Sequence, residues 1–293
     1  MEKIKDYLKL IRVRHWLKNL LIFVPLIFSK NLFNEQLFYR TLAAFIIFCL
    51  ISSIIYIFND LNDIEKDKKH QEKKKRPIPS GHISIKAAYI TIVVLVLLSI
   101  AIVVLMSKQI KLLSLITIPI IYLILNFLYT KVLKSIAIVD VFILVIGFLL
   151  RTLYGSLVTN IVISNWLYLM IIFLSFYLGF GKRRNEIINN GTKSRKSLEK
   201  YNKDFLDKNM YMCLSLSIIS YSLWSIDAKT ISRVGNNYLI WSILLLMAIL
   251  FCYNFDIEND SSGDPVEVLF NNKILCALVL IFCIYIITVL YVV

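Results

Sequence analysis

The chain has 293 residues, 58% of them hydrophobic, and a mean hydropathy of +0.73. This composition excludes an ordinary soluble domain and is typical of a protein that crosses a membrane several times. The net charge of +14 does not indicate a nucleic-acid partner, because the basic residues flank apolar runs and form no separate module.

Apolar runs recur along the chain, each long enough to span about 30 Å of hydrocarbon as a helix. The sequence therefore predicts an all-α membrane protein with nine transmembrane helices in one domain, residues 1–293. The first helix is the weakest, because Pro25 interrupts it. The predicted spans are 17–34, 38–58, 87–106, 112–129, 136–158, 164–181, 209–228, 237–255 and 274–293.

Basic residues are distributed unequally between the two sets of loops. If the N-terminus is cytoplasmic, most of the 33 Lys and Arg lie in inner segments, and few lie outside. The positive-inside rule then predicts a multi-pass protein of the cell membrane with a cytoplasmic N-terminus and an external C-terminus. The long polar segments, and with them the expected active site, face the cytoplasm.

An acidic motif follows the second predicted span directly. Asn59, Asp60, Asp63 and Asp67 fall within an arc of about 100° if the helix continues through them. Unpaired carboxylates at a membrane helix end are costly, and hard divalent cations relieve that cost. Because Mg²⁺ takes one or two carboxylates and shares its other positions with phosphates, the motif predicts a Mg²⁺–diphosphate site.

Basic residues stand near this motif on the same side of the membrane. Lys75 and Arg76 end a basic run before a rigid Pro-x-Pro-Ser-Gly turn, and we expect one of them to contact phosphate. Tyr129 and Lys134 stand where the fourth span leaves the membrane. Lys18 begins the first span, close to the same cytoplasmic mouth.

Two charges lie inside the fifth predicted span, Asp140 near its cytoplasmic end and Arg151 farther out. Charges within a membrane are functional or pair across helices. Their separation of about 16 Å along one helix excludes a direct pair, so each needs another partner. For Arg151, a structural partner and a functional one both stay open.

The second long cytoplasmic loop opens with a basic cluster. Lys182 and Glu186 are spaced so that they can pair on one helix face, while Arg183 and Arg184 offer forked donors to phosphate oxygens. The last cytoplasmic loop, 256–267, is acidic instead. It is either a second metal site or a cap that binds the basic loops.

Together these residues resemble the UbiA superfamily of intramembrane prenyltransferases, whose motif Asn59-Asp60-x-x-Asp63-x-x-x-Asp67 matches completely. Ordinary members carry a second Asp-rich motif where this chain has Lys182-Arg183-Arg184-Asn185-Glu186. That departure is similar to the branch of polyprenyl-phosphate phosphoribosyltransferases, as are the segments Arg12–Asn19 and Gly263–Glu267.

The resemblance implies nine helices around a cytoplasm-facing cavity and Mg²⁺-dependent transfer of 5-phosphoribose from phosphoribosyl pyrophosphate (PRPP) to a polyprenyl monophosphate. It implies that Asp60, Asp63 and Asp67 are catalytic and, with Asn59, hold the metal. The expected substrate-binding residues are Asn59, Lys18, Lys75, Arg76, Tyr129, Lys134, Asp140, Arg151, Lys182, Arg183, Arg184 and Glu186.

Two other functions stay open. A prenyltransferase acting on an aromatic acceptor would need a second Asp-x-x-x-Asp pair in 182–208, but Asp204 and Asp207 stand one residue too close. A non-catalytic lipid-phosphate transporter would favour polar groups at mid-membrane and on both faces, whereas this chain gathers them on one side. The oligomeric state also stays open.

Overall fold

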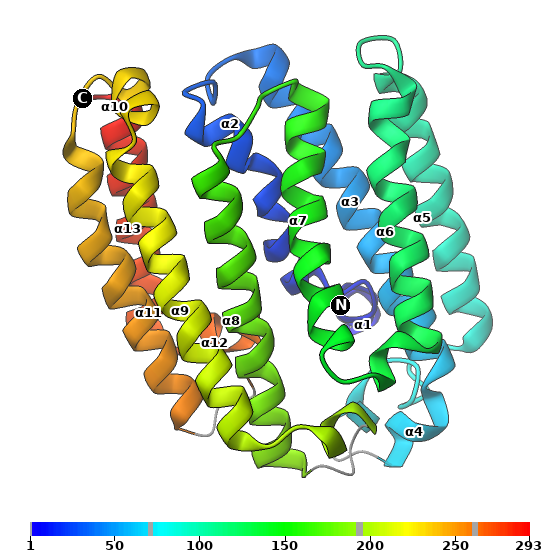
Figure 1. The fold of residues 1–293 in the computed structure, drawn as a ribbon. Helices are drawn as coiled ribbons and strands as arrows, with labels where there is room; N and C mark the ends of the chain where they lie inside the picture. Colours follow the sequence, from blue (N-terminus) through cyan, green and yellow to red (C-terminus); the bar gives the residue numbers. More distant parts are fainter. Residues whose placement is uncertain (1, 70–72, 192–195, 260–262) are drawn as a thin grey trace.

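Helices make up all the regular structure in the computed structural model, which describes residues 2–69, 73–191, 196–259 and 263–293 (Figure 1). The α-helices are α1 (Glu2–Leu10), α2 (Val24–Phe28), α3 (Glu35–Asn62), α4 (Ile64–Lys69), α5 (Ile85–Met106), α6 (Leu112–Lys131), α7 (Val139–Thr159), α8 (Asn165–Asn190), α9 (Lys203–Ile226), α10 (Ala228–Val234), α11 (Ser242–Glu258), α12 (Pro265–Asn271) and α13 (Lys273–Tyr291). Short 3₁₀ helices are η1 (Val13–Phe23), η2 (Lys73–Lys75), η3 (Leu133–Ser135), η5 (Lys196–Lys200) and η6 (Tyr238–Trp241).

Seven helices in the described chain are long and apolar enough to cross a membrane, which confirms a multi-pass, all-helical protein. They are α3, α5, α6, α7, α8, α11 with η6, and α13. The count differs from the nine spans expected from the sequence. Two predicted spans, 17–34 and 209–228, account for the difference.

The prediction of one continuous helix over 17–34 is wrong. The chain forms η1 and then the short α2, and Pro25 stands in the first turn of α2. Pro has no backbone N–H to donate, so it is accommodated in a first turn and disfavoured inside a longer helix. The other segment is a true helix, α9, which begins at Lys203, before its predicted start. Its apolar part contains five serines, Ser215, Ser217, Ser220, Ser222 and Ser225, which lower its mean hydropathy.

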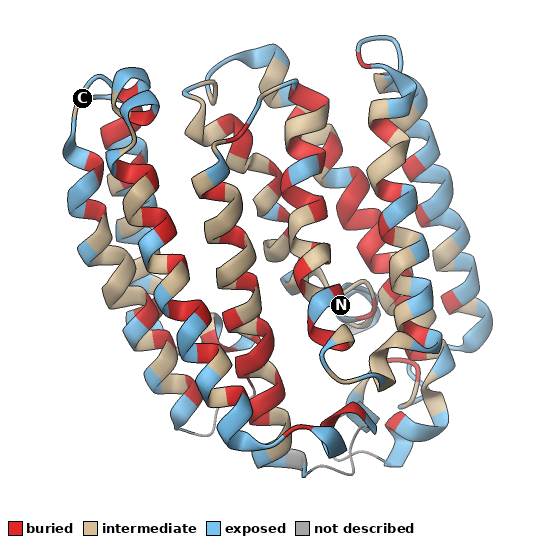
Figure 2. Cartoon of the chain, viewed as in Figure 1, coloured by how far each residue is buried: buried red, intermediate tan, exposed pale blue. Residues whose placement is uncertain are grey.

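The long helices run side by side, and α4 lies at the opposite end of the bundle from the C-terminus (Figure 1). Helix α5 exposes most of its surface, as expected for a helix that faces lipid (Figure 2). Buried positions concentrate on α3 and α7, where η1 packs closely. Gly155 permits that approach, because a Cβ there would lie 2.0 Å from the carbonyl oxygen of Ile22.

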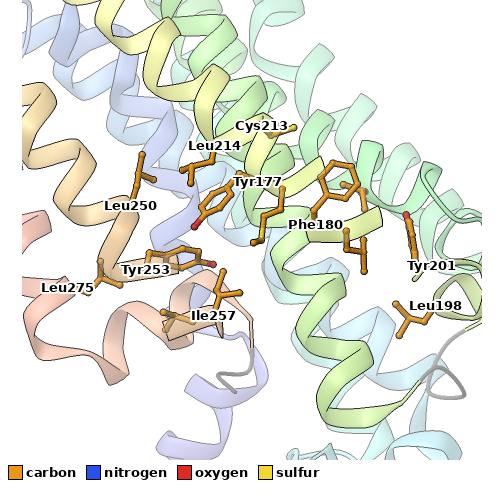
Figure 3. Packing of buried hydrophobic residues seen from close by; sticks show 14 residues of the cluster. Tyr177, Phe180, Leu198, Tyr201, Cys213, Leu214, Leu250, Tyr253, Ile257 and Leu275 are labelled. Carbon is orange, nitrogen blue, oxygen red and sulfur yellow. The ribbon is translucent and has the colours of Figure 1, made fainter. Parts of the chain in front are cut away.

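A hydrophobic cluster between α8, α9, α11 and α13 fixes the C-terminal end of α8 (Figure 3). Tyr177 and Phe180 of α8 pack there with Tyr253 of α11, and the Tyr177 and Tyr253 ring centroids are 5.8 Å apart. Both tyrosines are almost fully buried. This packing holds the next turn of α8, residues 181–186, in a fixed orientation at the mouth of the bundle.

Candidate functional site

The acidic motif spans the end of α3 and the start of α4. Asn59 and Asp60 lie in the last turn of α3, Asp63 is its C-cap, and Asp67 belongs to α4. The expected continuous helix is therefore broken at Asp63. The backbone N–H groups of Asp63 and Asp67 still donate to the carbonyls four residues earlier, at 3.0 and 2.8 Å. The chain thus stays close to helical across the bend and keeps the acidic residues together.

Arg76 joins two of these carboxylates. Its Nη1 lies 2.9 Å from Asp60 Oδ1 and 2.7 Å from Asp67 Oδ2, and both acidic residues are buried. Arg12 adds a second guanidinium, whose Nη2 lies 2.5 Å from Asp60 Oδ1. Arg12 has a left-handed backbone, with φ +52°, a conformation that costs a non-glycine residue free energy. The contact with Asp60 and the stacking of its guanidinium on the Tyr56 ring, 4.7 Å away, offset that cost.

The C-terminal end of α6 contacts both polar segments. Thr130 Oγ1 lies 2.6 Å from Asn59 Oδ1, and the preceding Tyr129 hydroxyl accepts a hydrogen bond from Arg183 at 3.2 Å. Lys134, just beyond α6, places its Nζ 3.3 Å from Asp63 Oδ2. Neighbouring residues of one helix end therefore bridge the acidic motif and the basic cluster of α8.

Arg183 is buried at the base of the basic cluster. Its Nη1 lies 2.5 Å from Glu186 Oε2, and its Nε lies 2.7 Å from Asp140 Oδ2. The Nε–H does not point at that oxygen, so the second contact is an ion pair without a formal hydrogen bond. Tyr201 and Ser197 also donate hydrogen bonds to Asp140, and burial raises the pKa of the Tyr201 hydroxyl above its usual range. Asp140 thus pairs with residues other than Arg151, as expected from the separation of these two charges along the helix.

A second ion-pair cluster joins three distant segments. Asp264 lies 3.2 Å from Lys18 Nζ and 3.1 Å from Lys182 Nζ. The carboxylate also caps α12 by accepting the backbone N–H of Val266. Although burial alone would raise it, the pKa of Asp264 is held well below its usual range by Lys182 and Lys18. Asp264 therefore supports the second interpretation of the acidic loop, a cap that binds basic residues, whereas Asp260 lies outside the described residues.

Gly263 brings this carboxylate to α8. Its φ is +70°, and a Cβ there would lie 2.9 Å from Asn185 Cβ and 3.1 Å from Lys182 Cα. Glycine alone avoids both the strain and the contact. Because Lys182 pairs with Asp264 and Glu186 pairs with Arg183, the expected Lys182–Glu186 pairing is replaced by two different ion pairs.

Arg184 and Arg151 have partners outside the acidic motif. Arg184 places its Nε 2.5 Å from Asp207 and its Nη1 3.2 Å from the carbonyl of Ile257. Arg151 is buried in α7, and its guanidinium donates to Asn19, to the carbonyl of Gly147 and to the hydroxyl of Tyr122.. Lys75 is exposed in η2. Their roles in substrate binding stay predictions.

The donor set of the acidic motif fits Mg²⁺. Within the described ranges, no three His, Cys, Asp or Glu side chains are already arranged around a common metal position. Oxygens of Asp60 and Asp67 nevertheless lie within 2.9 Å of one nitrogen of Arg76. The positively charged guanidinium of Arg76 therefore occupies the position between the two carboxylates. Carboxylate oxygens are the ligands that Mg²⁺ prefers.

Sequence reasoning missed several contacts that complete the site. Arg12 stands in a basic N-terminal segment, and Thr130 lies just past the end of the predicted span 112–129. Neither carries a local pattern that identifies its partner. Arg12 could have been found in the Arg12–Asn19 segment on which the resemblance rests, whereas Thr130 offered no signal.

Comparison with known proteins identifies related sequences. The sequence pattern of the UbiA prenyltransferase family matches residues 26–271. The chain is similar to the decaprenyl-phosphate phosphoribosyltransferase of Corynebacterium glutamicum, with 33% identity over 94% of this chain and 85% of that protein. The protein of the same name from Mycolicibacterium smegmatis is 27% identical over 93% of this chain and 88% of that protein.

A solved structure shares the fold. A UbiA homologue from Archaeoglobus fulgidus, bound to DMAPP and Mg²⁺, superposes with a TM-score of 0.67 at 18% identity, covering 98% of this chain and 100% of that one. At this identity the likeness establishes the architecture alone.

Proposed function

This chain belongs to the UbiA prenyltransferase family, and on that premise we propose that it transfers 5-phosphoribose from PRPP to a polyprenyl monophosphate. The products are a lipid-linked 5-phosphoribosyl phosphate and pyrophosphate. Two similar proteins carry the name decaprenyl-phosphate phosphoribosyltransferase. Our proposal extends that activity to this chain and rests on the residues of its own site.

One observation carries the proposal: cations surround a single acidic motif. Arg12, Arg76 and Lys134 contact its carboxylates, and the end of α8 adds Lys182 and Arg183 where a second carboxylate motif would serve a second metal. A donor with a 5-phosphate and an acceptor that is itself a phosphate both require cationic contacts. An uncharged aromatic acceptor would require none.

The ion pairs support an exchange of partners on substrate binding. In the chain alone, each motif carboxylate is neutralised by Arg or Lys. Asp60, Asp63, Asp67 and Asn59 would hold Mg²⁺, and the Arg and Lys side chains that now contact these carboxylates would then be available to phosphate oxygens. When bound, the metal offsets the negative charge of the diphosphate. The site therefore keeps its charges compensated in both states and avoids the cost of a buried, unpaired charge.

The chemistry then depends on positioning. An oxygen of the acceptor phosphate attacks the anomeric carbon of the ribose as the bond from that carbon to pyrophosphate breaks. The ring oxygen stabilises positive charge at this carbon, and the acceptor is anionic near neutral pH, so little general-base assistance is needed. Arg183 and Lys182 orient phosphate groups, and electrostatic support of the leaving group supplies much of the rate. A single displacement inverts the anomeric centre.

We further propose that residues 17–34, which comprise the end of η1 and α2, cross the membrane, as does α9, which gives nine passes in one domain over residues 1–293. The cytoplasm then faces α4 and η2, where basic residues are dense, and the C-terminus lies outside. In this orientation the acidic motif opens to cytoplasmic PRPP while the surrounding helices accept the lipid.

A label-partition assay tests the proposal. Purified protein is incubated with Mg²⁺, a polyprenyl phosphate and PRPP labelled either in the ribose or in the pyrophosphate. We expect ribose label to enter the organic phase and pyrophosphate label to remain aqueous. Release of pyrophosphate from an allylic diphosphate and an aromatic acceptor, with no ribose label in lipid, would assign the protein to the aromatic prenyltransferases instead.

A further inference from the structure

We infer, on the basis of the proposed function, that the isoprenoid chain of the acceptor lipid lies in an apolar groove between α3, α5 and α6. The groove has a volume of about 380 Å³. Ile54 and Phe58 of α3 form its floor, Ile92 of α5 forms one wall, and Leu123, Ile124 and Phe127 of α6 form the other.

The groove surface is almost entirely hydrocarbon. Asn126 is the one lining residue with a polar side chain, and its amide donates to the carbonyl of Tyr122 one turn earlier, at 2.8 Å. That bond satisfies the amide within its own helix. The groove exists because α5 packs mainly against α3 and makes few contacts with α6, so an apolar space stays open between α5 and α6.

The groove ends at the acidic motif. Phe58 immediately precedes Asn59. On the opposite wall, the carbonyl oxygen of Asn126 lies 2.8 Å from Thr130 Oγ1, which in turn lies 2.6 Å from Asn59 Oδ1. The phosphate of a lipid whose chain lies in the groove would therefore stand near the start of the acidic motif, next to the proposed metal ligands.

Charge at this end matches an anionic head group. Lys131 is exposed, with its Nζ 5.9 Å from the centroid of the Phe127 ring. Lys134 lies one turn farther and contacts Asp63. Two lysines above a narrow apolar groove suit an amphiphile with one phosphate and one long chain. A membrane phospholipid, with two chains and a bulkier head, is the competing occupant.

Photo-crosslinking tests occupancy without reference to turnover. A polyprenyl phosphate with a diazirine on its second isoprene unit, counted from the phosphate, is irradiated with the full-length protein in detergent, and the labelled peptides are identified. We expect labels within residues 54–58 and 123–128, and we expect unlabelled polyprenyl phosphate, but not phosphatidylglycerol, to compete. Equal competition by phosphatidylglycerol would assign the groove to bilayer lipid, and labels confined to other helices would overturn the proposal.

Kinetics give the second test. Ile92→Trp and Ile124→Trp fill the groove, while Val93→Trp and Ile121→Trp are matched controls outside its lining on the same two helices. A Trp side chain in the groove takes the space of the isoprenoid chain, so we expect the KM for a long-chain acceptor to rise about tenfold in the groove variants, which corresponds to about 1.4 kcal/mol. The KM for PRPP, and the turnover of the one-isoprene acceptor dimethylallyl phosphate, should not change. Equal effects in groove and control variants would overturn the inference.

The two tests separate this inference from the proposed function. If the protein failed to transfer phosphoribose but its groove peptides were still labelled competitively, the lipid site would stand and the reaction would be wrong. If transfer occurred while labelling and KM were insensitive to the groove, the reaction would stand and the chain would lie elsewhere.

Discussion

Arg76 Nη1 lies 2.7 Å from Asp67 Oδ2, so a cation from the basic run contacts the last carboxylate of the acidic motif. The same nitrogen contacts Asp60. The chain thus presents its proposed metal-binding and phosphate-binding groups already paired with each other. The predictions below follow from replacing this internal pairing by Mg²⁺ and phosphate.

Asp63 is the clearest test of the metal role, because it is partly exposed and contacts Lys134 at the site surface. Asp63→Asn should reduce turnover by about 100-fold, the scale of losing one electrostatic contact to the reacting groups. The unfolding free energy should fall by about 1 kcal/mol or less, as for other exposed ion pairs. Turnover against Mg²⁺ concentration measures the first effect and thermal unfolding the second.

Glu65→Gln is the matched control for Asp63, since Glu65 lies on α4 and forms an exposed pair with Lys68. It should leave both turnover and the Mg²⁺ requirement unchanged. A metal role for Asp63 would be wrong if the two variants had the same Mg²⁺ dependence.

Arg183 is expected to bind phosphate through a geometry that lysine cannot reproduce. Arg183→Lys keeps the charge but loses the fork that contacts Glu186, Tyr129 and Asp140. The KM for PRPP should rise about tenfold, as expected from one lost charge-assisted hydrogen bond. Arg40→Lys is the control, because Arg40 lies near the N-terminus of α3, at the end of that helix opposite to the acidic motif. Indistinguishable steady-state kinetics for the two variants would reduce the Arg183 cluster to a structural and topological role.

Asp264 allows the cap interpretation to be tested separately from helix capping. Asp264→Asn retains an oxygen that can accept the Val266 N–H, and Asn caps helices as well as Asp does. The ion pairs with Lys18 and Lys182 are lost, so the KM for PRPP should rise. Because both lysines are partly exposed, the destabilisation should be below about 3 kcal/mol.

The control for Asp264 is Glu267→Gln, an exposed position of α12. Substrate kinetics and thermal unfolding should both match the unmodified protein. If Asp264→Asn behaved in the same way, the contact between α12 and the basic residues would have no part in substrate binding.

His15 predicts how stability depends on pH. Burial, together with Lys18 and Arg12, lowers the pKa of this imidazole to about 4, against an opposing effect of Asp264. The unfolded chain, with a His pKa of about 6.5, binds the proton more readily. Stability should therefore be greatest above about pH 6.5 and be lost as the pH falls towards about 4.

Thermal unfolding between pH 4 and 8 measures this dependence. His15→Gln removes the titrating group and should flatten the curve, whereas His82→Gln changes a histidine with an exposed side chain and should not. A curve that keeps its slope in His15→Gln would assign the acid sensitivity to other groups.

The sequence was sufficient to predict the helical membrane fold and the acidic motif, because apolar length and residue spacing are local properties. The sequence did not predict the cluster of Lys18, Asp264 and Lys182. This cluster depends on the positive φ of Gly263 and on contacts between segments that are distant in the sequence. The prediction of a continuous first helix was wrong because Pro25 stands in the first turn of a separate helix, α2. The partners of Arg183 and Arg184 depend on side-chain geometry that spacing does not encode.

The mass of the lipid product is the most direct test of the account. Purified protein is incubated with Mg²⁺, PRPP and a polyprenyl phosphate of defined length, and the extracted lipid is analysed by mass spectrometry. We predict an acceptor that has gained one phosphoribosyl group, formed in an amount equal to the pyrophosphate released. An unchanged acceptor alongside a prenylated product from an allylic diphosphate would contradict the central claim.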